Sequence, residues 1–379
     1  MKPLSKCKNA GFTLLELLVA MGVTMILLYT AIQVFRDATY SNQTVVQAAD
    51  MSDNLRAGLN QIQTDLQQAG AGIIVGGIPI PFTPNGSGCA STQVINRPVL
   101  GGTSTFPACN ATLPAVEPGY MLGPPITAPD ATSGTVANPT SITDEITILY
   151  QDNTLLLDNL PVYSAAQCPN GSVSLAGTTL TITFDPNCIN LTTAGITVSP
   201  GDLIQLTDSL GSTLVCVTGV SLGANSLTFA AGDPFALNGR TETGGTINQM
   251  EPTGCGGGNA CFTGMLATRV WMVTYYLDDI TSPPFVRLIR QLNLHPATPV
   301  GETLENLQFT YNFVDGVTNP SNQPTVPSGN SESQIRSVDV YLAARSSYQG
   351  HAGENSFYSR SNLMTQVSLR SMAYVNRYE

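Results

Sequence analysis

The segment that most limits what this chain can fold into is residues 12–35. It is largely apolar, with one charged side chain and no proline. As an α-helix the segment rises about 36 Å, which is enough to cross a hydrocarbon core about 30 Å thick with some tilt. Its one charge, Glu16, lies four residues inside the run. A carboxylate at membrane depth costs roughly 2.5–3.5 kcal/mol on insertion scales, so such residues are rare and usually functional.

The residues before this run predict its orientation. Lys2, Lys6 and Lys8 are the only lysines in the 379-residue chain, and no comparable basic cluster follows the apolar run. By the positive-inside rule we expect the N-terminus in the cytoplasm and the rest of the chain on the other side of the membrane. A secretory signal peptide has its small-residue cleavage site after the apolar core. Here the small residue, Gly11, comes before it.

The helical pattern continues past the apolar run, since no proline follows Phe12 until Pro79. Apolar residues recur at 3–4 spacing over residues 40–69, which is typical of a helix with one buried face. One row is Ala48, Leu55, Ile62 and Ala69, and the next is Leu59 and Leu66. Most of the polar residues are expected on other faces: Asp50, Asp53, Asn54, Arg56, Asn60 and Asp65. The sequence predicts one helix of about 57 residues, about 85 Å long, with residues 36–70 as its amphipathic continuation.

Composition narrows the class of the remaining domain. Charged residues make up 11% of the chain, which also holds 35 Gly and 25 Pro. This is typical of a β-rich extracytoplasmic domain with long polar loops. The 15 Lys+Arg against 26 Asp+Glu give a formal net charge of −11. A general nucleic-acid binder needs cations to replace phosphate counterions, so this balance argues against one.

The eight cysteines point to an oxidising compartment. Cys7 precedes the apolar run, and seven cysteines follow it. Connectivity cannot be deduced from spacing, but proximity favours three pairs: Cys89 with Cys109, Cys168 with Cys188, and Cys255 with Cys261. Cys216, in the apolar run STLVCVTGV, is then expected as a buried strand thiol. Zinc at the third pair is disfavoured, because no histidine or second cysteine pair lies nearby.

The rest of the chain divides by pattern into two parts. Residues 71–140 are rich in Pro, Gly and Thr and predict a loop-rich excursion. Residues 141–379 hold short apolar runs separated by turn residues, which predict an antiparallel β-rich head. In its strongest strand, 268–278, Trp271 and Tyr275 should lie on one face and Met272 and Thr274 on the other, so core packing explains most of this pattern. Use of the second face at an interface is left open. The expected fold class is α+β, a long helical spine packed on a β-sheet head.

The N-terminal residues resemble a known family. GFTLLELLVAMGV, residues 11–23, is similar to the type III signal of type IV pilins and type II secretion pseudopilins, with a basic leader, residues 1–11, before it. The resemblance implies that a membrane prepilin peptidase cuts between Gly11 and Phe12 and methylates the new Phe12 amine. It also implies that Glu16 meets the Phe12 ammonium of a neighbouring subunit during assembly. Pairing with a cation makes a buried carboxylate tolerable. The alternative is an ordinary single-pass anchor with Glu16 near the cytoplasmic interface.

The C-terminal runs resemble the PilW type of minor pilin, whose relative is the J-type minor pseudopilin. The resemblance rests on a Gly201-Asp202 strand start, TYYLD followed by VRLIR, ENLQFTY, and an arginine-containing last strand. It implies a structural subunit, not an enzyme, that primes or caps type IV pilus assembly and supports twitching, adhesion and DNA uptake. Its implied partners are the prepilin peptidase, other minor pilins, the major pilin and the inner-membrane assembly platform.

The resemblance also implies a location and leaves alternatives open. A single-pass inner-membrane protein with a periplasmic head would pass into the extracellular filament or its tip. One alternative is a minor pseudopilin of a type II secretion system, and another is a tip adhesin with a ligand-binding head. An anchored enzyme is disfavoured, because the only histidines, His295 and His351, lie in unrelated contexts.

No cofactor is expected from the sequence. The acidic stretch 277–279 and Asp315 beside Gly316 could offer carboxylates to calcium. Neither stretch has the ligand spacing of an EF-hand loop, so solvated turn residues are the favoured interpretation.

Overall fold

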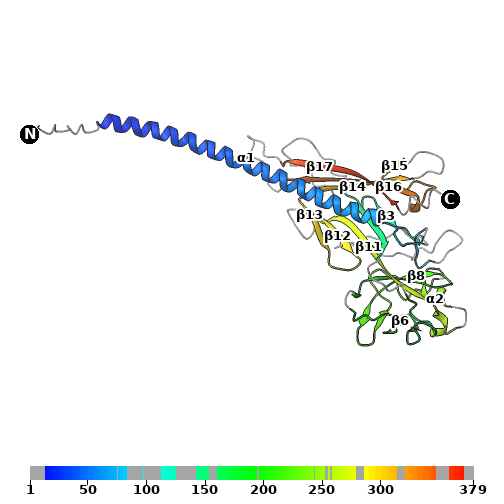
Figure 1. Cartoon of the computed structure of the whole chain (residues 1–379). Coiled ribbons are helices and arrows are strands. Elements are labelled where there is room, and N and C mark those ends of the chain that lie inside the picture. Colours follow the sequence, from blue (N-terminus) through cyan, green and yellow to red (C-terminus); the bar gives the residue numbers. More distant parts are fainter. Residues whose placement is uncertain are drawn as a thin grey trace, which may run out of the picture.

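The computed structural model describes residues 13–74, 76–82, 97, 112–124, 142–152, 160–193, 196–242, 244–251, 255–256, 258–278, 286–313, 321–346 and 358–370. Figure 1 shows a long helix whose first half projects freely from a β-rich head with two lobes. The sheets of the head are antiparallel throughout the described residues. The predicted α+β class is therefore confirmed.

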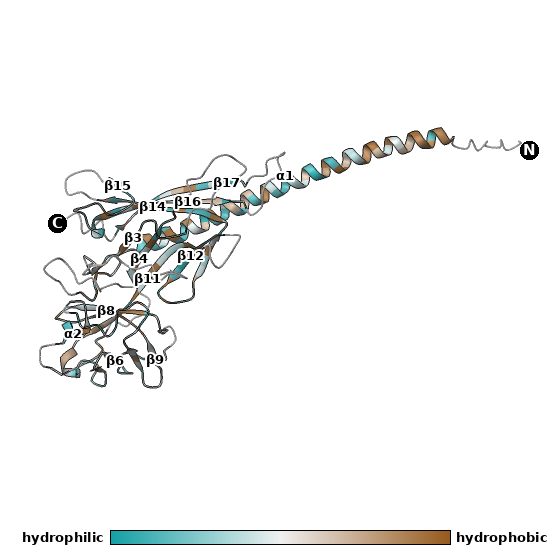
Figure 2. Cartoon of the chain, turned by 180° about the vertical axis from the view of Figure 1, so that it is seen from behind, coloured by the Kyte–Doolittle hydropathy of each residue, from teal (hydrophilic) through white to brown (hydrophobic). Residues whose placement is uncertain are grey.

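Helix α1 (Leu14–Gln68) is 55 residues long, so it spans about 83 Å. Thr13 is its N-cap, and Gly70 and Gly72 follow its end with positive φ angles of 76° and 73°. These left-handed positions suit glycine and turn the chain out of the helix. In Figure 2 the free half is mostly hydrophobic and the half against the head is mixed.

The second half of α1 is buried between two sheets. Its buried side is formed by Met51, Leu55, Gly58, Leu59, Ile62, Asp65 and Leu66. A Cβ on Gly58 would lie 2.9 Å from Cδ2 of Leu288 and 3.2 Å from Cδ2 of Leu342, which belong to different sheets. The glycine thus lets both sheets approach the helix closely.

Two details of the predicted buried face are wrong. Ala48 is exposed, because buried positions on α1 begin only at Met51. Asp65, expected among the polar residues of the other faces, is 2% exposed. Its carboxylate is buried because the head supplies hydrogen-bond donors for it, as described below.

The central sheet of the described residues has seven strands. Its main path is β13 (Thr298–Glu302), β12 (Arg287–Leu292), β11 (Leu266–Asp278), β4 (Glu145–Gln151) and β3 (Val116–Gly119). The other two strands are β7 (Leu203–Thr207), which pairs with β11, and β8 (Ser212–Cys216), which pairs with β7. Strand β3 comes from the predicted loop-rich excursion, most of which lies outside the described residues.

A second sheet covers the other side of α1. Its order is β15 (Ser321–Gln323), β14 (Leu304–Phe313), β16 (Ile335–Arg345) and β17 (Arg360–Ser368), and the short 3-10 helix η2 (Glu332–Gln334) precedes β16. Helix α1 contacts β16 and β17 on this side and β13 and β4 on the other. The helix and both sheets share one apolar core that includes Leu55, Ile62, Tyr275, Phe309 and Val367. We call this unit the spine lobe.

A second lobe, the insert lobe, is built from the described residues between 160 and 265 other than β7 and β8, which line it from the central sheet. Its four-stranded sheet has the order β5 (Ser172–Ala176), β6 (Thr179–Thr183), β10 (Ser226–Phe229) and β9 (Gly219–Ser221). It also holds α2 (Ile247–Met250) and η1 (Asn259–Phe262), and it packs around its own apolar cluster. A two-stranded sheet, β1 (Ile78–Pro79) with β2 (Thr112–Leu113), contributes to a third cluster beside β8 and β11.

Strand β11 joins the two lobes. Its first residues, Leu266–Val270, pair with β7, and its last residues, Val273–Asp278, pair with β12. Val273 and Tyr275 face the α1 core, while Met272 belongs to the third cluster. Thr274 is fully buried and its hydroxyl lies 2.9 Å from that of Thr147. Both faces are therefore largely buried within the chain, which confirms core packing as the role of these side chains.

Charged side chains reinforce this junction. The Arg269 guanidinium donates from Nε to Asp152 at 2.8 Å, lies 3.6 Å from Asp202 and sits 4.2 Å above the Trp271 ring. Asp202 also lies 2.6 Å from Nε2 of His295, which follows β12. The network links β11, β12 and the start of β7, and buried pairs of this kind fix geometry through several bonds at once.

One buried carboxylate attaches α1 to the central sheet. Asp65 accepts from Nε of Arg290 at 2.7 Å and from its Nη2 at 3.1 Å, and also from the hydroxyls of Tyr150 and Tyr275. Burial, reinforced by the Asp65 charge, raises the pKa of both tyrosines well above its usual range. Both hydroxyls therefore remain donors at any physiological pH, and the helix is held by three strands together.

Replacing this carboxylate should loosen the head. Asp65→Asn removes the charge that compensates Arg290, and breaking a buried pair from one side costs about 3 kcal/mol. We expect a fall of that size in the free energy of unfolding of the full chain in detergent, measured by urea titration. Asp53→Asn, an exposed position of the same helix, should change it by less than about 0.5 kcal/mol. Equal stability of the two variants would contradict the role of Asp65.

A second buried acidic group lies on β3, which pairs with β4 and contacts η2. Glu117 is 1% exposed, and the neighbouring Arg97 is 4% exposed and donates from Nη2 to the Pro118 carbonyl at 3.1 Å. Burial raises the pKa of Glu117 to about 8, although the Arg97 charge opposes the rise. Burial likewise raises the pKa of Asp144. Above the ordinary pKa of a carboxyl group, these two side chains therefore bind protons more tightly in the folded head than in the unfolded chain.

This arrangement predicts a pH dependence. Because the folded pKa of Glu117 lies above the unfolded value, its contribution to stability is complete below pH 4.5 and is lost as the pH rises toward 8. Glu117→Gln should lose less stability between pH 5 and 8 than the wild type, by at least about 1 kcal/mol, since one pKa unit is worth 1.36 kcal/mol. Denaturant titration of both proteins at the two pH values measures the difference. Parallel losses would exclude Glu117 as the titrating group.

Candidate functional site

The start of α1 carries a reciprocal cap between two polar residues. The Glu16 amide donates to Oγ1 of Thr13 at 3.3 Å, and Oε2 of Glu16 accepts from the Thr13 amide at 3.0 Å and from its hydroxyl at 3.1 Å. This capping box satisfies donors that a helix start leaves open. It also places the carboxylate at the positive end of the helix dipole. Sequence reasoning missed Thr13, although the pattern Thr-x-x-Glu before an apolar run signals it.

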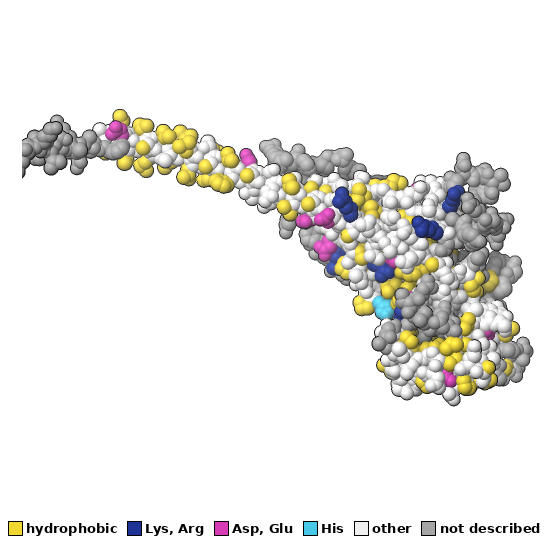
Figure 3. All heavy atoms as spheres, viewed as in Figure 1, with side chains coloured by type: hydrophobic (Ala, Val, Ile, Leu, Met, Phe, Trp, Pro, Cys, Tyr) yellow, Lys and Arg dark blue, Asp and Glu magenta, His cyan; other side chains and the backbone are white. Residues whose placement is uncertain are grey.

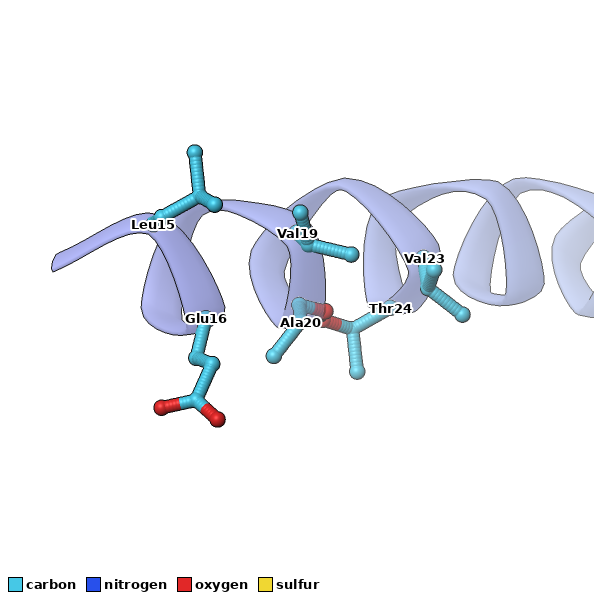
Figure 4. A pocket seen from close by; sticks show the side chains of 6 residues that line it. All are labelled: Leu15, Glu16, Val19, Ala20, Val23 and Thr24. Atoms are coloured by element: carbon cyan, nitrogen blue, oxygen red, sulfur yellow. Dashed lines mark hydrogen bonds between the residues drawn. The ribbon is translucent and has the colours of Figure 1, made fainter. Parts of the chain in front are cut away.

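The capping box uses only one of the two oxygens of the Glu16 carboxylate. Both bonds that Glu16 accepts end on Oε2, so Oε1 has no partner among the described residues. The side chain is exposed and extends away from the helix in Figure 4. The same glutamate can therefore cap its own helix and accept a bond from a cation of another chain.

A shallow groove runs from Glu16 along the helix. It is lined by Leu15, Glu16, Val19, Ala20, Val23 and Thr24. Figure 4 shows Ala20 and Thr24 in the same row as Glu16, one and two turns further on. Thr24 turns its hydroxyl back to the Ala20 carbonyl, so the row presents small and largely apolar surfaces. Small residues let a second helix approach closely in lipid.

The free half of α1 is too apolar to remain in water. Large exposed side chains cover it from Leu14 to Phe35, and Figure 3 shows hydrophobic side chains along the whole length of the face in view. Contiguous apolar surface of this extent marks a membrane or protein contact. The helix is long and apolar enough to cross a membrane. Glu16 is the one acidic residue within this stretch.

The other predicted site residues lie far along the chain from this start. The structure contains disulfides between Cys168 and Cys188 and between Cys255 and Cys261, which are two of the three pairs that proximity favours. Cys216 is a buried free thiol, and burial raises its pKa to about 12, so it is unreactive. Four predicted residues lie outside the described part of the chain: Gly11, Phe12, Cys89 and Cys109.

The described residues offer little for catalysis or metal binding. They hold no group of three or more His, Cys, Asp or Glu that could bind a metal ion. Asp278, in one of the two stretches considered for calcium, lies 3.7 Å from the Arg287 guanidinium. Asp279, Asp315 and His351 are outside the described residues. Calcium binding stays a prediction.

Comparison with known proteins identifies the N-terminal segment. Residues 6–28 match the family model for the prokaryotic N-terminal methylation motif. The chain carries a prepilin-type N-terminus. No curated protein and no solved structure matches the chain. The motif supports a structural subunit of the pilin or pseudopilin type, one that a prepilin peptidase processes and that assembles with other pilins. The long apolar helix agrees with membrane anchoring before assembly.

Proposed function

We propose that this protein is a minor pilin of the PilW type, a subunit that primes or caps a type IV pilus. A prepilin peptidase cuts after Gly11 and methylates Phe12, and α1 holds the processed chain in the inner membrane with its head in the periplasm. Assembly then transfers the apolar half of α1 from lipid into the filament core. No catalytic step is needed for this role.

The observation that carries the proposal is the start of α1. The motif at residues 6–28 precedes and overlaps a helix whose apolar half is exposed. The one carboxylate of that half, Glu16, has an oxygen without a partner among the described residues. A new Phe12 ammonium from a neighbouring subunit, at similar depth, would neutralise that carboxylate and set the axial register of the two helices. The groove beside Glu16 would let the neighbour approach.

The head supports a minor subunit over a major one. Two lobes on one helix make a wide head, and the described strands that pack most closely on α1 belong to the spine lobe. A wide head fits fewer positions of a tightly wound helical filament, so the ends of the filament suit it best. There the insert lobe would face other minor subunits or the surroundings, which is compatible with adhesion, twitching or DNA uptake.

Mass spectrometry of pili purified from the native host tests the proposal. We expect a peptide that begins with N-methylated Phe12, which would demonstrate cleavage and incorporation together. A mature protein that still begins at Met1 would overturn the proposal. Loss of the chain should remove surface pili while exoproteins are still secreted. The opposite phenotype would assign the chain to a type II secretion system as a pseudopilin.

Three variants separate the two roles of the carboxylate. Glu16→Gln removes the charge but retains the capping box, which accepts Gln at this position. Thr13→Ala removes the cap, at a cost of about 1 kcal/mol, but retains the charge. We expect Glu16→Gln and Glu16→Ala to insert and be cleaved normally yet to reach filaments at less than a tenth of the wild-type amount. Thr13→Ala should reach at least half.

Quantitative immunoblots of membranes and sheared pili give these amounts. Normal incorporation of Glu16→Gln would remove the charge from the assembly mechanism. A defect of Thr13→Ala as large as that of Glu16→Ala would instead assign the function of Glu16 to helix capping.

A further inference from the structure

Strand β17 is a long outer edge of the spine lobe. It is the last strand of its sheet, and no described residue pairs with its outer side. Its register with β16 runs without a shift over nine residue pairs, from Ser337 with Ser368 to Arg345 with Arg360. Proteins usually protect such an edge with a bulge, a proline or a lysine. Residues 360–368 contain none of these.

Two hydrogen bonds fix which backbone groups point outward. At the ends of the ladder Leu369 donates its amide to the Arg336 carbonyl at 2.9 Å, and Ser346 donates to the Ser359 carbonyl at 2.8 Å. Hydrogen-bonded pairs alternate along an antiparallel ladder, so the odd-numbered residues of β17 bond to β16. The outward amides and carbonyls belong to Arg360, Asn362, Met364, Gln366 and Ser368.

The side chains of β17 follow the same alternation. Val367 and Leu363 pack against the core around α1, whereas the even-numbered side chains are exposed, Met364 by 64%. The edge therefore offers five free backbone positions together with an apolar side chain near its middle. These are the features that an added strand uses, with affinity from backbone bonds and selectivity from alternate side chains.

The charge of this edge is opposite to that of the whole chain. Residues 358–370 hold two arginines and no acidic residue, although the chain has a net charge of −11. Arg360 pairs with Glu305 at 2.9 Å. Arg370 and the adjacent Arg336 are exposed and form no ion pair with the described carboxylates. Complementarity therefore favours a neutral to acidic strand with a carboxylate near Arg370.

A second copy of this chain anchored in the same membrane cannot add its own β17 to this edge. Antiparallel self-pairing places a two-fold axis perpendicular to the sheet. Because α1 packs on the face of this sheet, that axis would turn the helix of the second copy end for end. Two copies anchored in one membrane have the same orientation, so they cannot meet in this way.

We propose that the outer edge of β17 binds an extended, neutral to acidic segment of a different protein by strand addition. The added strand bonds to the outward backbone of residues 360–368, places an apolar side chain beside Met364 and brings a carboxylate to Arg370. The proposal does not require the chain to be a pilus subunit.

Peptide binding to the full chain in detergent micelles tests this. The probes are the fluorescein-labelled peptides EVTVTVTE and KVTVTVTK, with affinity read by fluorescence anisotropy. We expect the acidic peptide to bind at least tenfold more tightly than the basic one. Bound peptide should also slow amide hydrogen exchange at residues 362, 364 and 366. Absence of binding, or binding without this protection, would overturn the proposal.

A matched pair of variants locates the site. Gln366→Pro removes one outward amide and no bond to β16, because proline is tolerated on the open side of an edge strand. It should weaken binding of the acidic peptide at least tenfold, whereas Gln366→Thr should stay within twofold. Equal binding by both would overturn the proposal. If Gln366→Pro does not fold, Arg370→Glu decides, since it should reverse the preference between the two peptides and an unchanged preference would refute the site.

Discussion

The buried carboxylate of Asp65 is the interaction on which the rest of the structure depends. Taking such a charge out of water is costly unless several donors meet it, and here a guanidinium and two phenol hydroxyls do so. Apolar contacts alone would let the helix slide or rotate between its sheets, since they are not directional. The hydrogen bonds to Asp65 fix both the axial position and the rotation of α1, because the donors come from β4, β11 and β12. A pull on the free end of α1 is therefore passed to the whole central sheet.

At the other end of the same helix, a second carboxylate meets the opposite situation. Among the described residues Glu16 has one hydrogen-bond partner, Thr13, and its side chain is exposed. One helix thus carries a satisfied acid inside the head and an incompletely satisfied acid inside its membrane-sized half. The first fixes the helix within the head, and the second leaves one carboxylate oxygen without a partner among the described residues. The contrast between Asp65 and Glu16 explains how one continuous helix can be fully packed within its own head and lack contacts along its apolar half.

Sequence alone predicted the elements whose signal is local. The helix was within two residues of its observed bounds, because its apolar run and the absence of proline need no tertiary information. The strands around 268–278 and 335–346 followed from alternation. Asp65 was missed because its partners lie 85 to 225 residues away, and nothing near it in the chain announces them. The insert lobe was missed because its strands β5, β6, β9 and β10 have the same short alternating pattern as those of the main head, and only the pairing of the strands shows that they form a separate sheet.

The insertion of this lobe between β4 and β11 has a consequence for how the sequence of the head can vary. The chain leaves the main path of the central sheet after β4 and returns to it at β11, and the Asp152 amide donates to the Arg269 carbonyl at 2.9 Å. The two ends of the segment that forms the insert lobe are therefore hydrogen-bonded to each other beside the central sheet. Its own apolar cluster is separate from the core around α1. Residues of the insert lobe can therefore be replaced, deleted or added without changing how α1 packs on the central sheet. The outer surface of the lobe is free to diversify under selection.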